Sequence, residues 1–177
     1  MPNKSPLRIG LAGLGAVGLD VARRLIAGVP GLKLTAVAVR DLDKARRALP
    51  QLGDGIALRK ATELADDCDV VVECLPPALF RAVAISAIDK GRLFMPLSVA
   101  QLLENEDLIA RAKQTGARIL VPTGALIGLD AVRAAAEGTI HSIRMVTRKP
   151  PAGLDGAPYL RERGISLSGL TAPLKVF

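Results

Sequence analysis

The chain has 177 residues, of which 50% are apolar and only 2% aromatic, and it carries a net charge of +7. A core of that composition is built from Val, Leu, Ile and Ala, which suits a buried parallel sheet covered by helices. The basic residues are scattered over predicted helix faces without interleaved aromatic side chains, which argues against a nucleic-acid partner, and no apolar run is long enough to span a membrane.

The two cysteines, Cys68 and Cys74, are spaced too irregularly for a zinc site or a disulfide framework. We therefore expect no metal, two small buried thiols, and a reducing compartment, the cytoplasm. The uncharged run 9–19 follows basic residues, as in an export signal. Its glycines would break a helix there, so the run predicts a strand and a turn instead.

The first predicted element is a short apolar strand, Leu7–Ala12, which leads through a glycine turn into a helix. Gly13, Gly15 and Gly18 fill the G-x-G-x-x-G pattern. The first allows a tight turn, the second lets a pyrophosphate approach the backbone, and the third lets the helix pack closely on the strand. The pattern alone is weak, but this context favours a dinucleotide site over a chance glycine-rich turn. We expect the cofactor to contact Gly13, Gly15, Ala16, Val17 and Gly18.

The helix after this turn has an apolar stripe. Val17, Val21 and Leu25 recur at helical spacing, which predicts that all three side chains face the core. Gly28 and Pro30 are expected to end the helix.

A second strand is predicted over Leu32–Val39, with Arg40 and Asp41 at its carboxyl end. In a dinucleotide fold, an acidic residue here binds the ribose 2′-hydroxyl of NAD, whereas an arginine accommodates the 2′-phosphate of NADP. Asp41 is either a ribose contact or the N-cap of a helix over 43–49. Because the usual acidic position is occupied by Val39 and Arg40 follows it, the site leans towards NADP or towards use of both cofactors.

A short strand over 56–58 and a brief helix over 62–66 precede the run 69–77, which contains three consecutive valines. This run predicts a buried central strand. Its carboxyl end, formed by Cys74, Leu75 and Pro76, should face the cofactor, since ligands lie outside the carboxyl ends of parallel strands. Glu73 is either a surface contact or a partner of cofactor or backbone.

The pattern then alternates between helices over 80–89 and 106–114 and strands over 93–98 and 117–122, with Gly116 ending the second helix. We expect Ser98, after the fifth strand, to contact the cofactor. Gly124 and Ala125, in the loop before a helix over 129–136, should lie near its nicotinamide end. This alternation predicts an α/β fold with a doubly wound parallel sheet of the Rossmann type.

From Ile140 the apolar period changes from helical to two, which predicts a strand in a second domain. We therefore place a dinucleotide-binding domain at 1–138 and the start of an incomplete α+β substrate and dimerisation domain at 139–177. The single histidine, His141, lies on the more apolar face of that strand, which favours a structural role over catalysis. A helical turn is predicted over 159–163 and a further strand from Leu174.

Taken together, these motifs resemble the L-aspartate dehydrogenase family. The matching stretches are Gly13–Gly18, Asp69–Cys74, Pro122–Ala125 with Gly128–Asp130, and Arg148–Pro151. The chain departs from the family pattern at Thr123, where a serine is usual, at Ile127, where a glycine is usual, and at Ala100–Leu102.

The resemblance implies an NAD(P)-dependent oxidoreductase that transfers hydride from L-aspartate, a dicarboxylate, and feeds iminoaspartate into NAD biosynthesis. It implies a homodimer and a catalytic histidine in a segment later than Phe177, so the catalytic residues stay unassigned. The apolar ending favours a fragment of a longer protein over a shortened homologue. Arg144, Arg148 and Lys149 are candidate carboxylate clamps.

Two alternatives stay open: a non-catalytic NAD(P)-binding or redox-sensing module, and another dehydrogenase of amino-acid metabolism such as homoserine dehydrogenase. Sugar oxidoreductases with this fold are disfavoured, because they carry Glu-Lys-Pro where this chain has Pro96-Leu97-Ser98.

Overall fold

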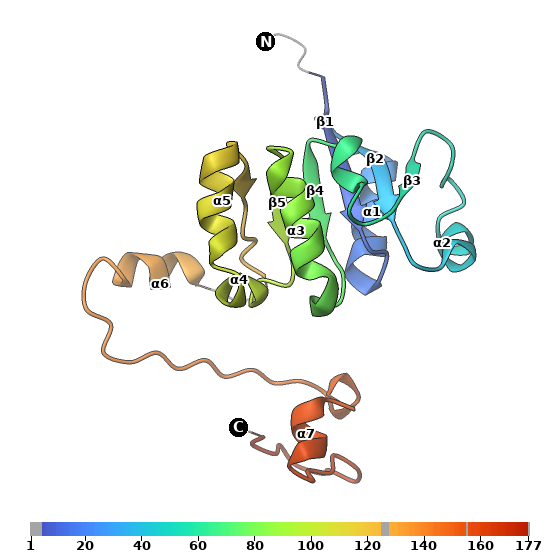
Figure 1. The fold of residues 1–177 in the computed structure, drawn as a ribbon. Helices are drawn as coiled ribbons and strands as arrows, with labels where there is room; N and C mark the ends of the chain where they lie inside the picture. The colour runs from blue at the N-terminus through green and yellow to red at the C-terminus, as the bar shows by residue number, and fades with distance from the viewer. Residues whose placement is uncertain (1–4, 125–127, 155, 177) are drawn as a thin grey trace. The chain divides into compact units, whose positions relative to one another are not determined.

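A computed structural model describes residues 5–124, 128–154 and 156–176. It divides the chain into two compact units, one reaching residue 127 and the other starting at Gly128 (Figure 1). Each unit is described by itself below.

The first unit is built on a six-stranded parallel sheet with the strand order β3-β2-β1-β4-β5-β6. This order reverses direction between β1 and β4, which is the switch point of a doubly wound sheet. The predicted Rossmann-type fold is therefore confirmed. The strands are β1 (Leu7–Ala12), β2 (Leu32–Ala38), β3 (Ala57–Arg59), β4 (Val70–Glu73), β5 (Leu93–Pro96) and β6 (Arg118–Ile119).

Helices cover both faces of this sheet. Because side chains alternate along a strand, Val70 and Val72 of β4 pack into one apolar cluster with α1 and α2, whereas Val71 packs into the opposite cluster with α3 and α5. Figure 1 shows α3 and α5 side by side on one face. The helical segments are α1 (Ala16–Gly28), α2 (Leu42–Ala48), η1 (Leu64–Asp66), η2 (Pro77–Leu79), α3 (Phe80–Asp89), α4 (Gln101–Glu104) and α5 (Asp107–Thr115).

Most predicted boundaries lie within one or two residues of the observed ones, and α5 ends as predicted at Gly116, which has φ +74°. The prediction of a long sixth strand is wrong, because β6 contains two residues rather than the run 117–122. Leu120 and Val121 are 47% exposed, since the strand lies at the edge of the sheet and only β5 pairs with it. The short helix α4 was not predicted.

The apolar stripe on α1 is also corrected. The buried residues of this helix are Gly18, Ala22 and Leu25, while Val17 is 56% exposed. The helix begins at Ala16, so Val17 lies in its first turn, beside the cavity described below rather than over the sheet.

The second unit contains α6 (Leu129–Ala135), η3 (Pro151–Gly153) and α7 (Pro158–Glu162). The predicted strand from Ile140 is wrong: residues 139–150 have no regular secondary structure and are exposed, and residues 174–176 form no strand. A strand persists only when a neighbour satisfies its backbone, and no other described segment pairs with this one. His141 is consequently exposed rather than packed inside a sheet.

No helix in the described ranges is long and apolar enough to cross a membrane.

Candidate functional site

The glycine turn between β1 and α1 has a different geometry at each of its three glycines. Gly13 has φ +99°, and a Cβ atom there would lie 2.6 Å from the carbonyl oxygen of Cys74. A Cβ atom on Gly18 would lie 2.1 Å from the carbonyl oxygen of Gly13. A Cβ atom on Gly15 would meet nothing within 4 Å. The chain's own packing therefore requires the first and third glycines, while the second borders open space.

That open space is a cavity of about 260 Å³ at the carboxyl ends of β1, β4 and β5. Seven residues expected from the sequence to contact a cofactor meet here, and they come from three separate loops. Leu97 also lines the cavity and was missed, although its position directly before Ser98 could have indicated it. The lining residues are Gly15, Ala16, Val17, Gly18, Cys74, Leu75, Leu97 and Ser98.

The amino terminus of α1 supplies the polar groups at one side of this cavity. Gly15 is the N-cap, and no side chain of the described residues caps the helix or places a carboxylate in its first turn. The first-turn N–H groups are thus left for a ligand, and the helix dipole adds positive potential there. Such a terminus fits a phosphate group, and Gly15 leaves space for it to approach.

Glu73 is not part of the cavity lining, but it holds two of the lining residues, Leu75 and Ser98. Its side chain is fully buried at the end of β4. One carboxylate oxygen accepts hydrogen bonds from the Leu75 backbone N–H (2.7 Å) and the Ser98 hydroxyl (3.2 Å). The other accepts the Ser98 backbone N–H at 3.0 Å. The structure therefore resolves the open alternative: Glu73 binds backbone and is not a surface contact.

The two cysteines have different surroundings, and both are free thiols. Cys68 is buried against η1, where its thiol donates to the carbonyl of Leu64, and burial raises its pKa to about 11. Cys74 is half-buried and lines the cavity, and burial, with the charge of Glu73, raises its pKa to about 11. Both thiols are thus protonated and unreactive near neutral pH.

The other predicted cofactor residues are not part of the cavity lining. Gly13 N–H donates to the carbonyl of Ala38 (2.8 Å), which ties the end of β2 to the glycine turn. Just beyond that end, the Asp41 side chain accepts the Lys44 N–H (2.9 Å) and caps α2. Arg40 is exposed and forms no ion pair within the described chain.

Three further predicted residues remain. Pro76 is exposed and turns the chain into η2, away from the cavity lining. Gly124 is exposed with φ +63°. Ala125 lies outside the described residues.

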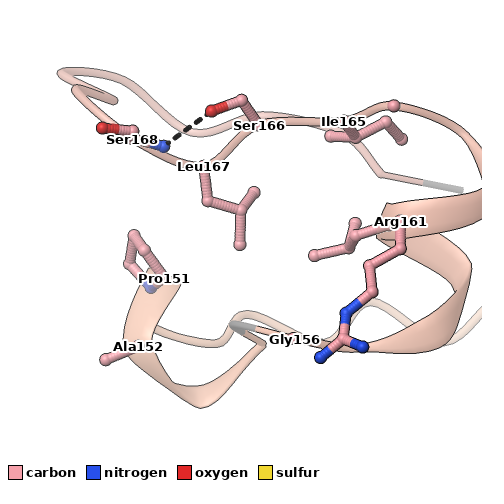
Figure 2. Close-up of a pocket in the computed structure, with 10 residues that line it drawn as sticks. Pro151, Ala152, Gly156, Arg161, Ile165, Ser166, Leu167 and Ser168 are labelled. Atoms are coloured by element: carbon pink, nitrogen blue, oxygen red, sulfur yellow. Dashed lines mark hydrogen bonds between the residues drawn. The ribbon is translucent and has the colours of Figure 1, made fainter.

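A second cavity, of about 850 Å³, lies within the unit that begins at Gly128. Figure 2 shows Leu167 and Pro151 on its walls and the Arg161 side chain extending towards Gly156. Gly156 leaves room for that guanidinium, since a Cβ atom there would lie 2.9 Å from it. Among the described residues, no cluster of His, Cys, Asp or Glu could hold a metal ion.

A parallel sheet in this strand order, with a glycine turn and a free helix terminus at the switch point, defines the class of dinucleotide-binding domains. The comparison with protein families agrees. Residues 13–122 match the family described as the NAD-binding domain of homoserine dehydrogenase, and the chain belongs to that family.

Individual relatives sharpen this placement. The chain is 47% identical to an L-aspartate dehydrogenase of Bradyrhizobium diazoefficiens over 98% of its length. It is 43% identical to L-aspartate dehydrogenase 3 of Bordetella bronchiseptica over its whole length. It spans 61% and 65% of the lengths of these two relatives. The resemblance predicted from the motifs is confirmed.

Solved structures show the same fold at low sequence identity. Myo-inositol 2-dehydrogenase from Lactobacillus plantarum is 19% identical, with a TM-score of 0.57 over 75% of this chain and 41% of that one. Scyllo-inositol dehydrogenase from Lactobacillus casei, solved with bound NAD(H) and scyllo-inositol, is 16% identical, with a TM-score of 0.56 over the same shares.

Proposed function

We propose that this chain carries the cofactor site of an NAD(P)-dependent L-aspartate dehydrogenase. The single observation that supports it best is the open face of Gly15 beside a helix terminus free of side-chain caps, in a chain 47% identical to a protein of that name. In the proposed reaction, the α-carbon of L-aspartate loses a hydride and its amine loses a proton. The product is iminoaspartate, which supplies NAD biosynthesis or is hydrolysed to oxaloacetate and ammonia.

In this scheme, the residues of this chain bind the cofactor and orient it. The first turn of α1 holds the pyrophosphate, and the loops after β4 and β5 hold the second nucleotide. Bound nicotinamide supplies the hydride acceptor. The Cys74 thiol in the cavity lining stays neutral, because its pKa is about 11, so it would neither repel a phosphate nor act as a nucleophile.

For the substrate we propose only candidate binding residues. Arg144, Arg148 and Lys149 lie in the exposed segment 139–150 and are our candidates to bind the two carboxylates of aspartate. No general base is assigned. A homodimer and a cytoplasmic location complete the proposal, the latter supported by the two free thiols.

We further propose that NADP is accepted at least as well as NAD. The carboxylate of Asp41 already accepts the Lys44 N–H, whereas Arg40 is exposed, forms no ion pair with the described residues, and could bind a 2′-phosphate. The variant Arg40→Gln should weaken NADPH binding about tenfold and leave NADH binding within twofold, since a charged hydrogen bond to phosphate is lost. Fluorescence titration measures both constants. Equal loss for the two cofactors, or an unmodified chain that binds NADPH far more weakly than NADH, would contradict it.

The family description provides a second candidate substrate, L-homoserine. Absorbance at 340 nm, measured on the protein isolated from its native source with each amino acid and each oxidised cofactor, separates the candidates. We expect turnover of L-aspartate alone. Turnover of homoserine alone would replace our proposal, and cofactor binding without turnover of either would favour the non-catalytic module.

A further inference from the structure

The buried carboxylate of Glu73 does more than complete the core. Its three donors come from two loops, one after β4 and one after β5, and both loops line the cavity. The main chain strengthens the same link, because the Leu97 N–H donates to the Glu73 carbonyl oxygen at 3.0 Å. A single side chain therefore fixes the spacing of the two loops.

The geometry also determines where the Ser98 hydroxyl donates its hydrogen bond and where it can accept one. Both of its protein partners, the Glu73 carboxylate (3.2 Å) and the Leu75 carbonyl (3.3 Å), can only accept. The hydroxyl therefore donates its hydrogen to one of these two protein acceptors, and its oxygen lone pairs are left to accept. Ser98 can then only accept a hydrogen bond from a bound molecule.

We infer that Glu73 is a positioning residue for the second nucleotide of the cofactor, and that through it Ser98 accepts a hydrogen bond from an N–H or O–H donor of the nicotinamide riboside half. The inference rests on the proposed cofactor site. It concerns one half of the dinucleotide only, because β4 and β5 belong to the second mononucleotide-binding half of the sheet, whereas the glycine turn serves the pyrophosphate.

The test compares two ligands on the 177-residue chain: NADH, which has both nucleotides, and ADP, which lacks the second. Calorimetry gives both dissociation constants for the variants Glu73→Gln and Ser98→Ala and for their combination. We expect NADH binding to weaken about tenfold in Glu73→Gln, where an amide meets the backbone donors, and about threefold to tenfold in Ser98→Ala. ADP binding should stay within twofold in both.

The double variant adds a readout that a general loss of packing would not produce. If Ser98 acts through Glu73, the serine change should cost less in the Glu73→Gln background than in the unmodified chain. Two matched controls are Asp69→Asn, a carboxylate-to-amide change at the other end of β4, and Ser86→Ala, whose hydroxyl bonds the Thr62 carbonyl. Both should leave NADH binding unchanged.

Equal weakening of NADH and ADP, or additive effects of the two changes, would overturn the inference, as would NADH binding within twofold in both single variants. Should Glu73→Gln not fold, Ser98→Ala alone tests the inference, since NADH binding should weaken in this variant while ADP binding stays within twofold. A parent chain that binds ADP but neither NADH nor NADPH would instead remove the proposed function.

Discussion

Strand β4 carries a carboxylate at each of its ends, and the two are used in opposite ways. At the amino end, Asp69 accepts the backbone N–H of Arg8 and pairs with its guanidinium (2.7 Å), with 34% and 45% of the two side chains exposed. At the carboxyl end, Glu73 is fully buried and bonds only backbone and a hydroxyl. A carboxylate thus forms a screened surface ion pair at one end and anchors the two cavity-lining loops at the other.

The difference extends to the whole sheet. The amino end is closed by exposed ion pairs, including Lys90 with Asp66, in which each partner can be replaced by water. At the carboxyl end, backbone atoms approach so closely that side chains are excluded at Gly13 and Gly18. Tolerance to substitution should therefore fall sharply from one end of the sheet to the other.

The largest expected effect is at Gly18. In the variant Gly18→Ala, the new methyl group would lie 2.1 Å from a backbone oxygen that cannot move without opening the turn. We expect a loss of about 3 kcal/mol or more in the free energy of unfolding, together with loss of cofactor binding. Urea denaturation followed by circular dichroism measures it. A variant as stable as the parent would contradict the packing role.

Glu73→Ala should follow closely. It leaves the N–H groups of Leu75 and Ser98 without their partner in a partly buried site. An unsatisfied buried donor costs about 1–3 kcal/mol, so we expect a total loss of roughly 2–4 kcal/mol. The same urea titration measures this loss. If the free energy of unfolding falls no further than in Asp69→Ala, the two ends of β4 do not differ as proposed.

Gly15→Val separates stability from binding at the carboxyl end. A side chain here points into open space, so the free energy of unfolding should change by less than about 1 kcal/mol. The same side chain fills the space that a phosphate needs, so NADH affinity should fall at least about tenfold. Titration of NADH fluorescence beside thermal unfolding checks both. Unchanged affinity would remove the phosphate from this turn.

The smallest effect belongs to Asp69, and it depends on pH. The hydrogen bonds from the Arg8 side chain, and then from its backbone, hold the pKa of Asp69 below its usual value. The pair therefore stabilises the fold above about pH 4, the unfolded-state pKa, and this contribution is lost as the pH falls through the lower folded-state pKa. Asp69→Asn should lower the melting temperature by roughly 2 °C at pH 7 and less at pH 3. Equal shifts in melting temperature at pH 7 and pH 3 would contradict a contribution from the ionised Asp69.

Much of the fold and part of the site followed from the sequence, because local rules carry them. The valine run of β4, the glycine spacing and the stop at Gly116 each depend on residues close in sequence. Seven cavity-lining residues could be predicted for the same reason, since four belong to the glycine motif at the start of α1 and the others lie just after strands β4 and β5.

Other features required partners distant in sequence. Nothing near Glu73 shows that Ser98, 25 residues later, will bind its carboxylate. The alternating pattern from Ile140 predicts a strand, but a strand needs a neighbour to satisfy its backbone, and no described segment pairs with residues 139–150. Val17 fits the apolar period of α1, yet it lies beyond the sheet that would have covered it.

The sequence by itself thus determined the order of strands and helices, the glycine turn and the class of ligand, because periodicity and backbone freedom act over a few residues. Only the tertiary structure decided which side chains are buried at the switch point, how Glu73 joins two loops, and which way the Ser98 hydroxyl points. Those properties depend on the distance between strands β4 and β5, which is set when the sheet assembles.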